Sequence, residues 1–205
     1  MIKKWILGLL LACAPALGLA ADATTQLRQF IETVRSATGQ FEQQRLENRG
    51  NSRAQTGQFA FKRPGQFLWQ VEQPYEQLVL SDGKVLYQYD PDLAQVTRRP
   101  VSQSIGASPA AILFGSGSLD QAFTLTNLPA DQGLDWLRAQ PRNPEAGFTH
   151  VDIGFRNGLP ARLLLLDAFG QTTRINLSNI TRNPALDDNR FTFTPPPGVD
   201  VVNMQ

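Results

Sequence analysis

The chain has 205 residues, a formal net charge of +1, one cysteine and one histidine. So small a net charge leaves no basic surplus for phosphate backbones, which argues against nucleic acid as a partner. With 41% hydrophobic residues, the chain can build a folded core, and its length suits a single domain. One histidine and one cysteine also make a disulfide, a zinc site or a catalytic triad hard to assemble, so we expect no metal and no cofactor.

The first 20 residues have the pattern of a secretory signal peptide. Two lysines precede an apolar run of 15 residues, too short to span a bilayer, that ends in small residues at Gly18 and Ala20. Cleavage after Ala20 would leave 185 residues with 17 basic and 18 acidic side chains, a net charge of −1. We therefore expect a signal peptide over 1–20 and a single exported domain over 21–205.

The cysteine allows a second interpretation of this leader. Residues 10–13 loosely resemble a lipobox, in which Cys13 would be acylated and would anchor the mature chain to a membrane. Leucine at the middle position is less usual there than a small residue, and the apolar run continues beyond Cys13. We favour cleavage after Ala20, which removes Cys13 and leaves the exported chain without a thiol.

Residues 24–36 predict one amphipathic helix. Its apolar residues follow the i, i+3, i+4, i+7 spacing of a single helix face, with charged and amide residues between them. Three residues can cap its N-terminus. The apolar positions are Leu27, Phe30, Ile31 and Val34, and the candidate caps are Asp22, Thr24 and Thr25.

After this helix the apolar residues recur with a period of two, which is typical of strands. Turn sequences such as Arg63-Pro64-Gly65 and Arg156-Asn157-Gly158 separate the runs. Ten to twelve short strands joined by tight turns predict a large antiparallel sheet, so the fold class is mainly β (α+β). The alternating positions are Phe59 and Phe61; Phe67, Trp69 and Val71; Val85, Tyr87 and Tyr89; Val151, Ile153 and Phe155; Ile175 and Leu177; and Phe191 and Phe193.

Two segments interrupt this pattern. Residues 108–114 read as a short apolar helix, because Ser108 can cap it, Pro109 suits its first turn and Gly115 follows its end. In residues 134–137 helix and strand signals are balanced, and we favour a strand.

The apolar face of such a sheet is broader than one 13-residue helix can cover. One interpretation is an ordinary packed core beneath two helices, and the other is a cavity for an apolar ligand. Arg63 bears on this choice, because in a strand continued by one residue it shares the face of Phe59 and Phe61. Its guanidinium would then need carbonyl partners, for which the 108–114 helix is the candidate. The alternative is a turn arginine in solvent.

An enzyme needs a constellation that this chain does not offer. His150 has the polar parity of its strand, beside Asp152, and we expect it to be exposed. The paired carboxylates Asp90 and Asp92, and Asp187 and Asp188, are better explained as turn caps than as acid–base or cation sites. We therefore expect no catalytic residue.

Several blocks of the chain together form a pattern that runs in order from about Leu27 to Val201. The blocks are residues 57–69 (GQFAFKRPGQFLW), 73–74 (QP), 81–83 (SDG), 89–96 (YDPDLAQV), 167–172 (DAFGQT) and 191–200 (FTFTPPPGVD). Their specific parts are Lys-Arg-Pro-Gly-x-Phe-x-Trp and Tyr-Asp-Pro-Asp-Leu. The pattern resembles the periplasmic outer-membrane lipoprotein carrier of Gram-negative bacteria, the LolA family, and residues 116–148 depart most from it.

The resemblance implies an unclosed antiparallel β-barrel of about eleven strands, with an N-terminal helix and a short lid helix over an apolar cavity. It implies that Arg63 latches the lid and that Phe67 lies near the cavity mouth, where cargo is handed over. Further acyl-chain cavity positions would be Phe59, Phe61, Trp69 and Val71, and further lid positions Ile112, Leu113 and Phe114.

The same resemblance implies a soluble periplasmic chaperone that works as a monomer. Its partners would be acylated lipoproteins, an ABC-type lipoprotein exporter of the inner membrane and a lipoprotein receptor of the outer membrane. Two alternatives are a lipid-anchored receptor of the same fold, similar to LolB, and a lipid-sensing regulatory domain. The fate of Cys13 separates the shuttle from the anchored receptor.

Overall fold

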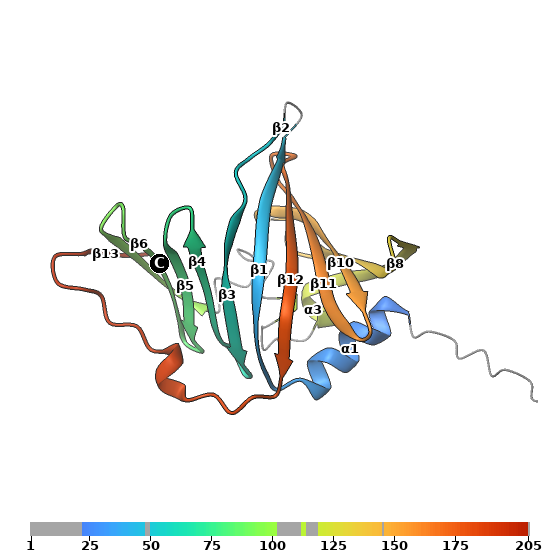
Figure 1. Ribbon diagram of the computed structural model, residues 1–205, viewed down its shortest axis with the longest axis horizontal. Coiled ribbons are helices and arrows are strands. Elements are labelled where there is room, and N and C mark those ends of the chain that lie inside the picture. The colour runs from blue at the N-terminus through green and yellow to red at the C-terminus, as the bar shows by residue number, and fades with distance from the viewer. Residues whose placement is uncertain (1–21, 48–49, 102–111, 114–118, 145, 205) are drawn as a thin grey trace, which may run out of the picture.

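The computed structural model describes residues 22–47, 50–101, 112–113, 119–144 and 146–204. Its strands form one sheet of thirteen, in the order β13-β7-β6-β5-β4-β3-β1-β12-β11-β10-β9-β8, with β2 beside β1 (Figure 1). The strands are β1 Ser36–Glu47, β2 Gly50–Asn51, β3 Gln55–Lys62, β4 Gln66–Gln73, β5 Gln77–Asp82, β6 Val85–Asp90, β7 Gln95–Pro100, β8 Phe123–Asp131, β9 Leu134–Pro141, β10 Phe148–Arg156, β11 Leu159–Asp167, β12 Thr172–Arg182 and β13 Asp200–Asn203.

The sheet is unclosed, and within the described residues every pairing is antiparallel except that of β13 with β7. The predicted fold class is therefore confirmed, although there are thirteen strands rather than about eleven. The two shortest, β2 and β13, contain two and four residues, too few to produce a recognisable alternating pattern. Residues 134–137 lie in β9, as favoured.

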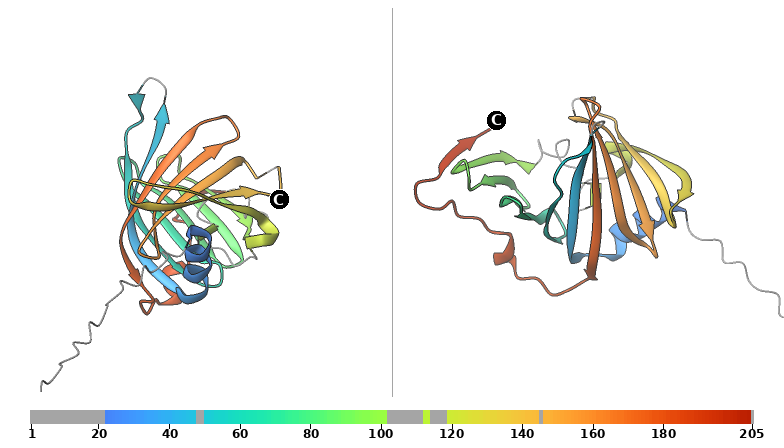
Figure 2. Two further views of the ribbon diagram at one scale, coloured as in Figure 1. Left: turned by 90° about the vertical axis from the view of Figure 1, so that its right-hand side faces the viewer. Right: turned by 45° about the horizontal axis from the view of Figure 1, so that its top comes forward.

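Helix α1 spans Ala23–Thr33, so it begins one residue before the predicted 24–36 segment and ends three residues before that segment does. Asp22 is the N-cap, accepting a hydrogen bond from the Thr25 backbone N–H at 2.8 Å, so one of the three candidate caps is the one used. The sheet curls so that α1 and the short helix α3, Leu119–Ala122, lie on its concave side (Figure 2). Among the described residues, no helix has both the length and the apolar character needed to cross a membrane.

One large hydrophobic core fills the concave side of the sheet. Its residues come from α1, from both halves of the sheet and from residues 112–113. The hairpin turn at Asn157-Gly158 fits the sequence prediction, since both residues have positive φ, 53° and 74°, as a tight two-residue turn requires.

The C-terminal segment corrects one prediction. Phe191 and Phe193 do not belong to a strand, because residues 188–191 form a 3-10 helix, η2 (Asp188–Phe191), and the next strand begins at Asp200. This segment leaves β12 and runs to the far edge of the sheet, contacting β4 and β5 through η2 on the way (Figure 1). Phe191 is fully buried yet outside the concave core, so the alternating phenylalanines reflect packing of an irregular segment.

Candidate functional site

Arg63 lies in the turn between β3 and β4, and its guanidinium joins two separate parts of the chain. Nε donates to the Val34 carbonyl at 3.0 Å, and Nη2 donates to the Leu113 carbonyl at 2.5 Å. The Arg63 Cζ also lies 4.9 Å from the centre of the Phe61 ring. Arg63 therefore faces the apolar side, and the alternative of a turn arginine in solvent is wrong.

The surroundings of Arg63 explain why a cation is tolerated there. Val34 follows the last turn of α1, where unpaired carbonyls and the helix dipole favour positive charge. Burial, followed by repulsion from Arg35, lowers the pKa of Arg63 to about 10. The guanidinium is still protonated at neutral pH, so both contacts are charge-assisted hydrogen bonds.

The predicted cavity positions lie together in the concave core. Phe59, Phe61, Phe67 and Val71 are buried, and Trp69 is half-buried against them. Of the predicted lid residues, Ile112 and Leu113 are helical and buried in the same core, whereas Phe114 and the rest of the predicted 108–114 helix lie outside the described residues.

Sequence reasoning missed Phe41, which stacks on Trp69 with ring centroids 3.8 Å apart. Strand β1 shows no apolar alternation because Gly39 occupies one of its inward positions, where a large side chain would be expected. Gly57 of β3, opposite Phe41, is a second glycine at an inward position. A Cβ at Gly39 would lie 2.5 Å from the Phe59 ring. One at Gly57 would lie 1.9 Å from the Gln70 carbonyl oxygen and 2.9 Å from the Phe41 ring. The two glycines make room for aromatic rings, and their positions opposite Phe59 and Phe41 become apparent only once the register is known.

Sequence reasoning also missed the polar contacts that hold α1 on the sheet. Gln26 is buried, donates to Asp135 at 2.8 Å and accepts from the Gly158 backbone N–H at 3.1 Å. Arg28 forms a bidentate ion pair with Asp120 of α3, at 2.9 and 2.7 Å. These contacts bind one end of α1 to β9 and α3, while its other end meets Arg63.

His150 was expected to be exposed, and the structure corrects this. Its side chain is 17% exposed, and its Nε2 lies 3.9 Å from Asp152, which Arg138 already binds with two hydrogen bonds. Burial lowers the pKa of His150, opposed by Asp152 and reinforced by Arg138. Asp152 is therefore the ion-pair partner of Arg138, and the His150 imidazole is a neighbour of that ion pair.

Replacing His150 with glutamine is expected to reduce the loss of thermal stability on mild acidification. A folded-state pKa below the ordinary value of 6.5 means that the unfolded chain binds more protons, so stability falls as pH drops below that value. Melting temperatures of wild type and His150→Gln at about pH 7.5 and about pH 5.5 test this. Equal losses in both proteins would contradict it.

One carboxylate of each predicted pair caps a turn, which confirms the prediction for Asp90 and Asp187. Asp90 accepts from the Leu93 N–H at 3.2 Å, and Asp187 accepts from the Asn189 N–H at 2.9 Å. Asp188 pairs with Lys62 at 2.6 Å. Within the described part of the chain, no group of three or more His, Cys, Asp or Glu side chains is arranged to hold a metal ion.

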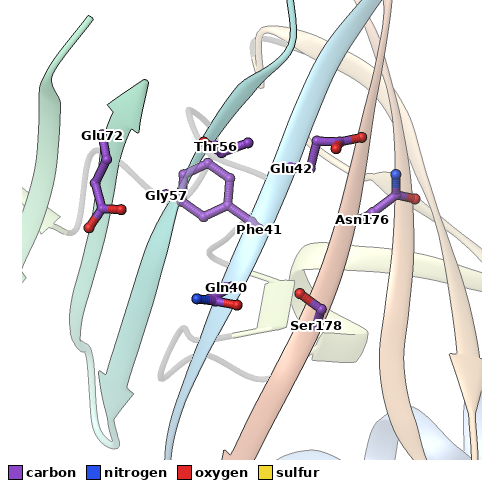
Figure 3. Close-up of a pocket in the computed structure, with 8 residues that line it drawn as sticks. All are labelled: Gln40, Phe41, Glu42, Thr56, Gly57, Glu72, Asn176 and Ser178. Atoms are coloured by element: carbon purple, nitrogen blue, oxygen red, sulfur yellow. The ribbon is translucent and has the colours of Figure 1, made fainter. Parts of the chain in front are cut away.

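A polar pocket of about 400 Å³ lies across β12, β1, β3 and β4 (Figure 3). Apart from Phe41 and Gly57 its lining is hydrophilic, with Glu42 and Glu72 as its charged groups. None of the predicted cavity residues lines it. It has the character of the solvated face of the sheet and does not suit acyl chains.

Comparisons with known proteins agree with this architecture. Residues 32–194 match the family described as outer membrane lipoprotein carrier protein LolA. A relative from Bordetella avium, named outer-membrane lipoprotein carrier protein, is 62% identical over 196 residues, covering 95% of this chain and 94% of its own. Relatives of the same name from Bordetella pertussis and Cupriavidus pinatubonensis are 58% and 45% identical, covering 95% and 89% of this chain and 91% and 88% of theirs.

Two solved structures are similar in fold. An uncharacterized conserved protein from Thermus thermophilus superposes with a TM-score of 0.54 at 12% identity, over 88% of this chain and 96% of its own. A LolA superfamily protein from Nitrosomonas europaea superposes with a TM-score of 0.51 at 15% identity, over 85% of this chain and 99% of its own. With the length and identity of the sequence matches, the chain belongs to the LolA family of outer membrane lipoprotein carrier proteins.

Proposed function

We propose that this protein is a periplasmic chaperone that binds the acyl chains of lipoproteins released from the inner membrane and shuttles them to the outer membrane. The observation that supports the proposal is the match over residues 32–194 to the family described as outer membrane lipoprotein carrier protein, with a relative of that name at 62% identity. The apolar concave side of the sheet, closed at one end by Arg63, is the place where the acyl chains would lie.

The physical need for such a carrier follows from the size of the hydrophobic effect. Each methylene exposed to water costs about 0.8 kcal/mol, so a lipoprotein with two or three acyl chains cannot cross an aqueous compartment unshielded. The carrier must nevertheless release what it holds. In this structure, buried residues such as Ile112 and Leu113 fill the core, so incoming chains would displace protein contacts and the net affinity would stay modest.

In this proposal, Arg63 latches the closed state. Its hydrogen bonds to Val34 and Leu113 would have to break before acyl chains can occupy the space beneath Leu113. Phe67, buried near this end of β4, would lie at the mouth through which cargo is handed over. Phe59, Phe61, Trp69 and Val71 would line the space for acyl chains, with Ile112, Leu113 and Phe114 as parts of the lid.

The proposal includes two membrane partners. Opening the latch costs free energy, which an ATP-driven ABC-type exporter of the inner membrane would supply while loading the carrier. Transfer to an outer-membrane lipoprotein receptor of greater affinity would then be downhill. The carrier would act as a monomer, and no catalytic step is required of it.

The leader belongs to the same proposal. Cleavage after Ala20 would release a soluble periplasmic chain that has lost Cys13, whereas acylation at Cys13 would make an anchored receptor. The intact mass of the mature protein distinguishes the two directly. A mature chain that begins at Ala21 supports the shuttle, and one that begins at an acylated Cys13 contradicts it.

The function itself is tested by release from spheroplasts. The purified mature protein is added to spheroplasts that have newly synthesised outer-membrane lipoproteins, and lipoprotein in the supernatant is measured. Release that depends on the added protein is expected. A protein that binds acyl probes but releases no lipoprotein would be a sensor rather than a carrier.

A further inference from the structure

A second pocket, of about 510 Å³, is lined by residues from the end of β1 and the start of β3. Figure 1 shows that these strand ends, next to β2, lie at the end of the sheet remote from α1. Six of its lining residues determine its chemistry, and all of them carry polar groups. They are Gln43, Arg45, Arg53, Gln55, Tyr75 and Thr173.

Four strand residues of this pocket, Gln43, Arg45, Gln55 and Thr173, continue the concave face of the sheet, whereas Gln44 of β1 has the opposite parity. Residues two apart in a strand share a face, so Gln43 and Arg45 share the face of the buried Phe41. Gln43 pairs with Gln55, and Arg45 pairs with Thr173. The apolar lining of the concave side therefore changes to a polar lining at this end of β1, β3 and β12.

Beyond Thr173, the residues that pair across β11 and β10 are apolar. Thr173 pairs with Leu165 of β11, and Leu165 pairs with the fully buried Val151 of β10. The polar pocket thus borders directly on apolar side chains, an arrangement that suits a ligand with one polar and one apolar part.

The charge of the pocket is positive. Among its described lining residues there is no carboxylate, in contrast to the pocket of Figure 3, which holds two glutamates. Arg45 and Arg53 are exposed, and in the part of the chain that the structure describes their side chains form no hydrogen bond or ion pair. Guanidinium groups carry five donors and no acceptor, so they select oxygen-rich or anionic groups.

We propose that this pocket is a head-group site, in which Arg45 and Arg53 bind the oxygen-rich polar end of an acylated ligand whose chains enter the concave core. The inference rests on the proposed function, since it presupposes that the core accepts acyl chains. The oxygens could be the ester and amide carbonyls of a lipidated N-terminus or the phosphate of a phospholipid.

The site is independent of the Arg63 contacts. Arg53 and Arg63 lie beyond opposite ends of β3, which has eight residues. At roughly 3.3 Å per residue, the strand separates them by more than about 20 Å. Substitutions at the head-group site should therefore leave the Arg63 contacts intact.

The test compares three probes on the mature protein and on the double variant Arg45→Gln/Arg53→Gln. The probes are a diacylated lipopeptide with an uncharged peptide, lysophosphatidylglycerol, and a long-chain alcohol without a carbonyl or phosphate, each measured by displacement of a fluorescent acyl reporter. The matched control is Arg156→Gln/Arg182→Gln. It removes two exposed arginines at the C-terminal ends of β10 and β12, the ends remote from the pocket.

The double variant is expected to bind the lipopeptide, the lysophospholipid or both about tenfold more weakly, with the alcohol and the control variant unchanged. Weaker binding of the lipopeptide alone identifies a lipidated N-terminus as the ligand of the site. Weaker binding of the lysophospholipid alone identifies a phospholipid. Unchanged binding of both, or an equal loss for the alcohol, overturns the head-group site. A wild-type protein that binds none of the three probes instead refutes the proposed function on which the site rests.

Discussion

Replacing Arg63 with leucine is expected to raise the affinity of the protein for an acyl-chain probe by about tenfold or more. The guanidinium makes hydrogen bonds to Val34 and Leu113 in the closed structure. A charge-assisted hydrogen bond contributes about 1.5–3 kcal/mol, and about 1.4 kcal/mol corresponds to a tenfold change in binding. Without these bonds, displacing Ile112 and Leu113 from the core costs less, so more of the binding free energy of the ligand is retained.

Titration with a fluorescent fatty acid measures this effect, and a lysine variant supplies the graded comparison. Arg63→Lys keeps the charge but lacks the planar fork that reaches two carbonyls at once, so an intermediate affinity is expected. Arg35→Leu is the matched control, since Arg35 is exposed and its charge merely lowers the pKa of Arg63. An Arg63→Leu protein that folds normally and binds with wild-type affinity would eliminate the latch.

Much of this architecture could be predicted because the strands on one side of the sheet have regular alternation. In β3 and β4 the inward positions Phe59, Phe61, Phe67 and Val71 are all buried, as the period of two indicates. The turns between strands were equally predictable, since Asn157-Gly158 supplies the positive φ that a two-residue hairpin needs.

The remaining features depend on register, which local sequence does not specify. Strand β1 is hard to recognise because Gly39 takes one of its inward positions and leaves room for the Phe59 ring of β3. Phe191 resembles a strand residue in sequence, yet it is buried by an irregular segment that returns to β4 and β5 from a distant part of the chain. Such burial follows from tertiary packing rather than from local spacing.

The candidate site shows the same division. The parity of β3 made an inward Arg63 one of two open interpretations, and the Val34 carbonyl became its partner only because α1 ends next to the β3–β4 turn. The Arg28–Asp120 ion pair joins residues 92 positions apart, so no local pattern could indicate it. The head-group site escaped sequence reasoning because Arg45 and Arg53 look like ordinary exposed charges until the pairing of β1 with β3 and β12 is known.

Truncation of Phe59 to alanine is expected to destabilise the ligand-free protein by about 3–5 kcal/mol, the usual cost of removing a buried phenylalanine side chain. Phe59 is 1% exposed in the concave core, and its ring centroid lies 6.0 Å from that of Trp69. If this core is also the space that acyl chains occupy, a bound chain fills the void. A saturating acyl ligand should therefore raise the melting temperature of Phe59→Ala by more than that of wild type.

Phe191→Ala is the matched control for this experiment. Phe191 is the same residue type and is fully buried, but it lies outside the concave core, at the end of η2 in the C-terminal segment. Its truncation should cost a similar free energy of unfolding, while the ligand raises its melting temperature only by the wild-type increment, because the new void is out of reach. Equal ligand-induced shifts in Phe59→Ala and Phe191→Ala would mean that acyl chains do not enter the space beside Phe59, and the concave core would then be an ordinary packed interior.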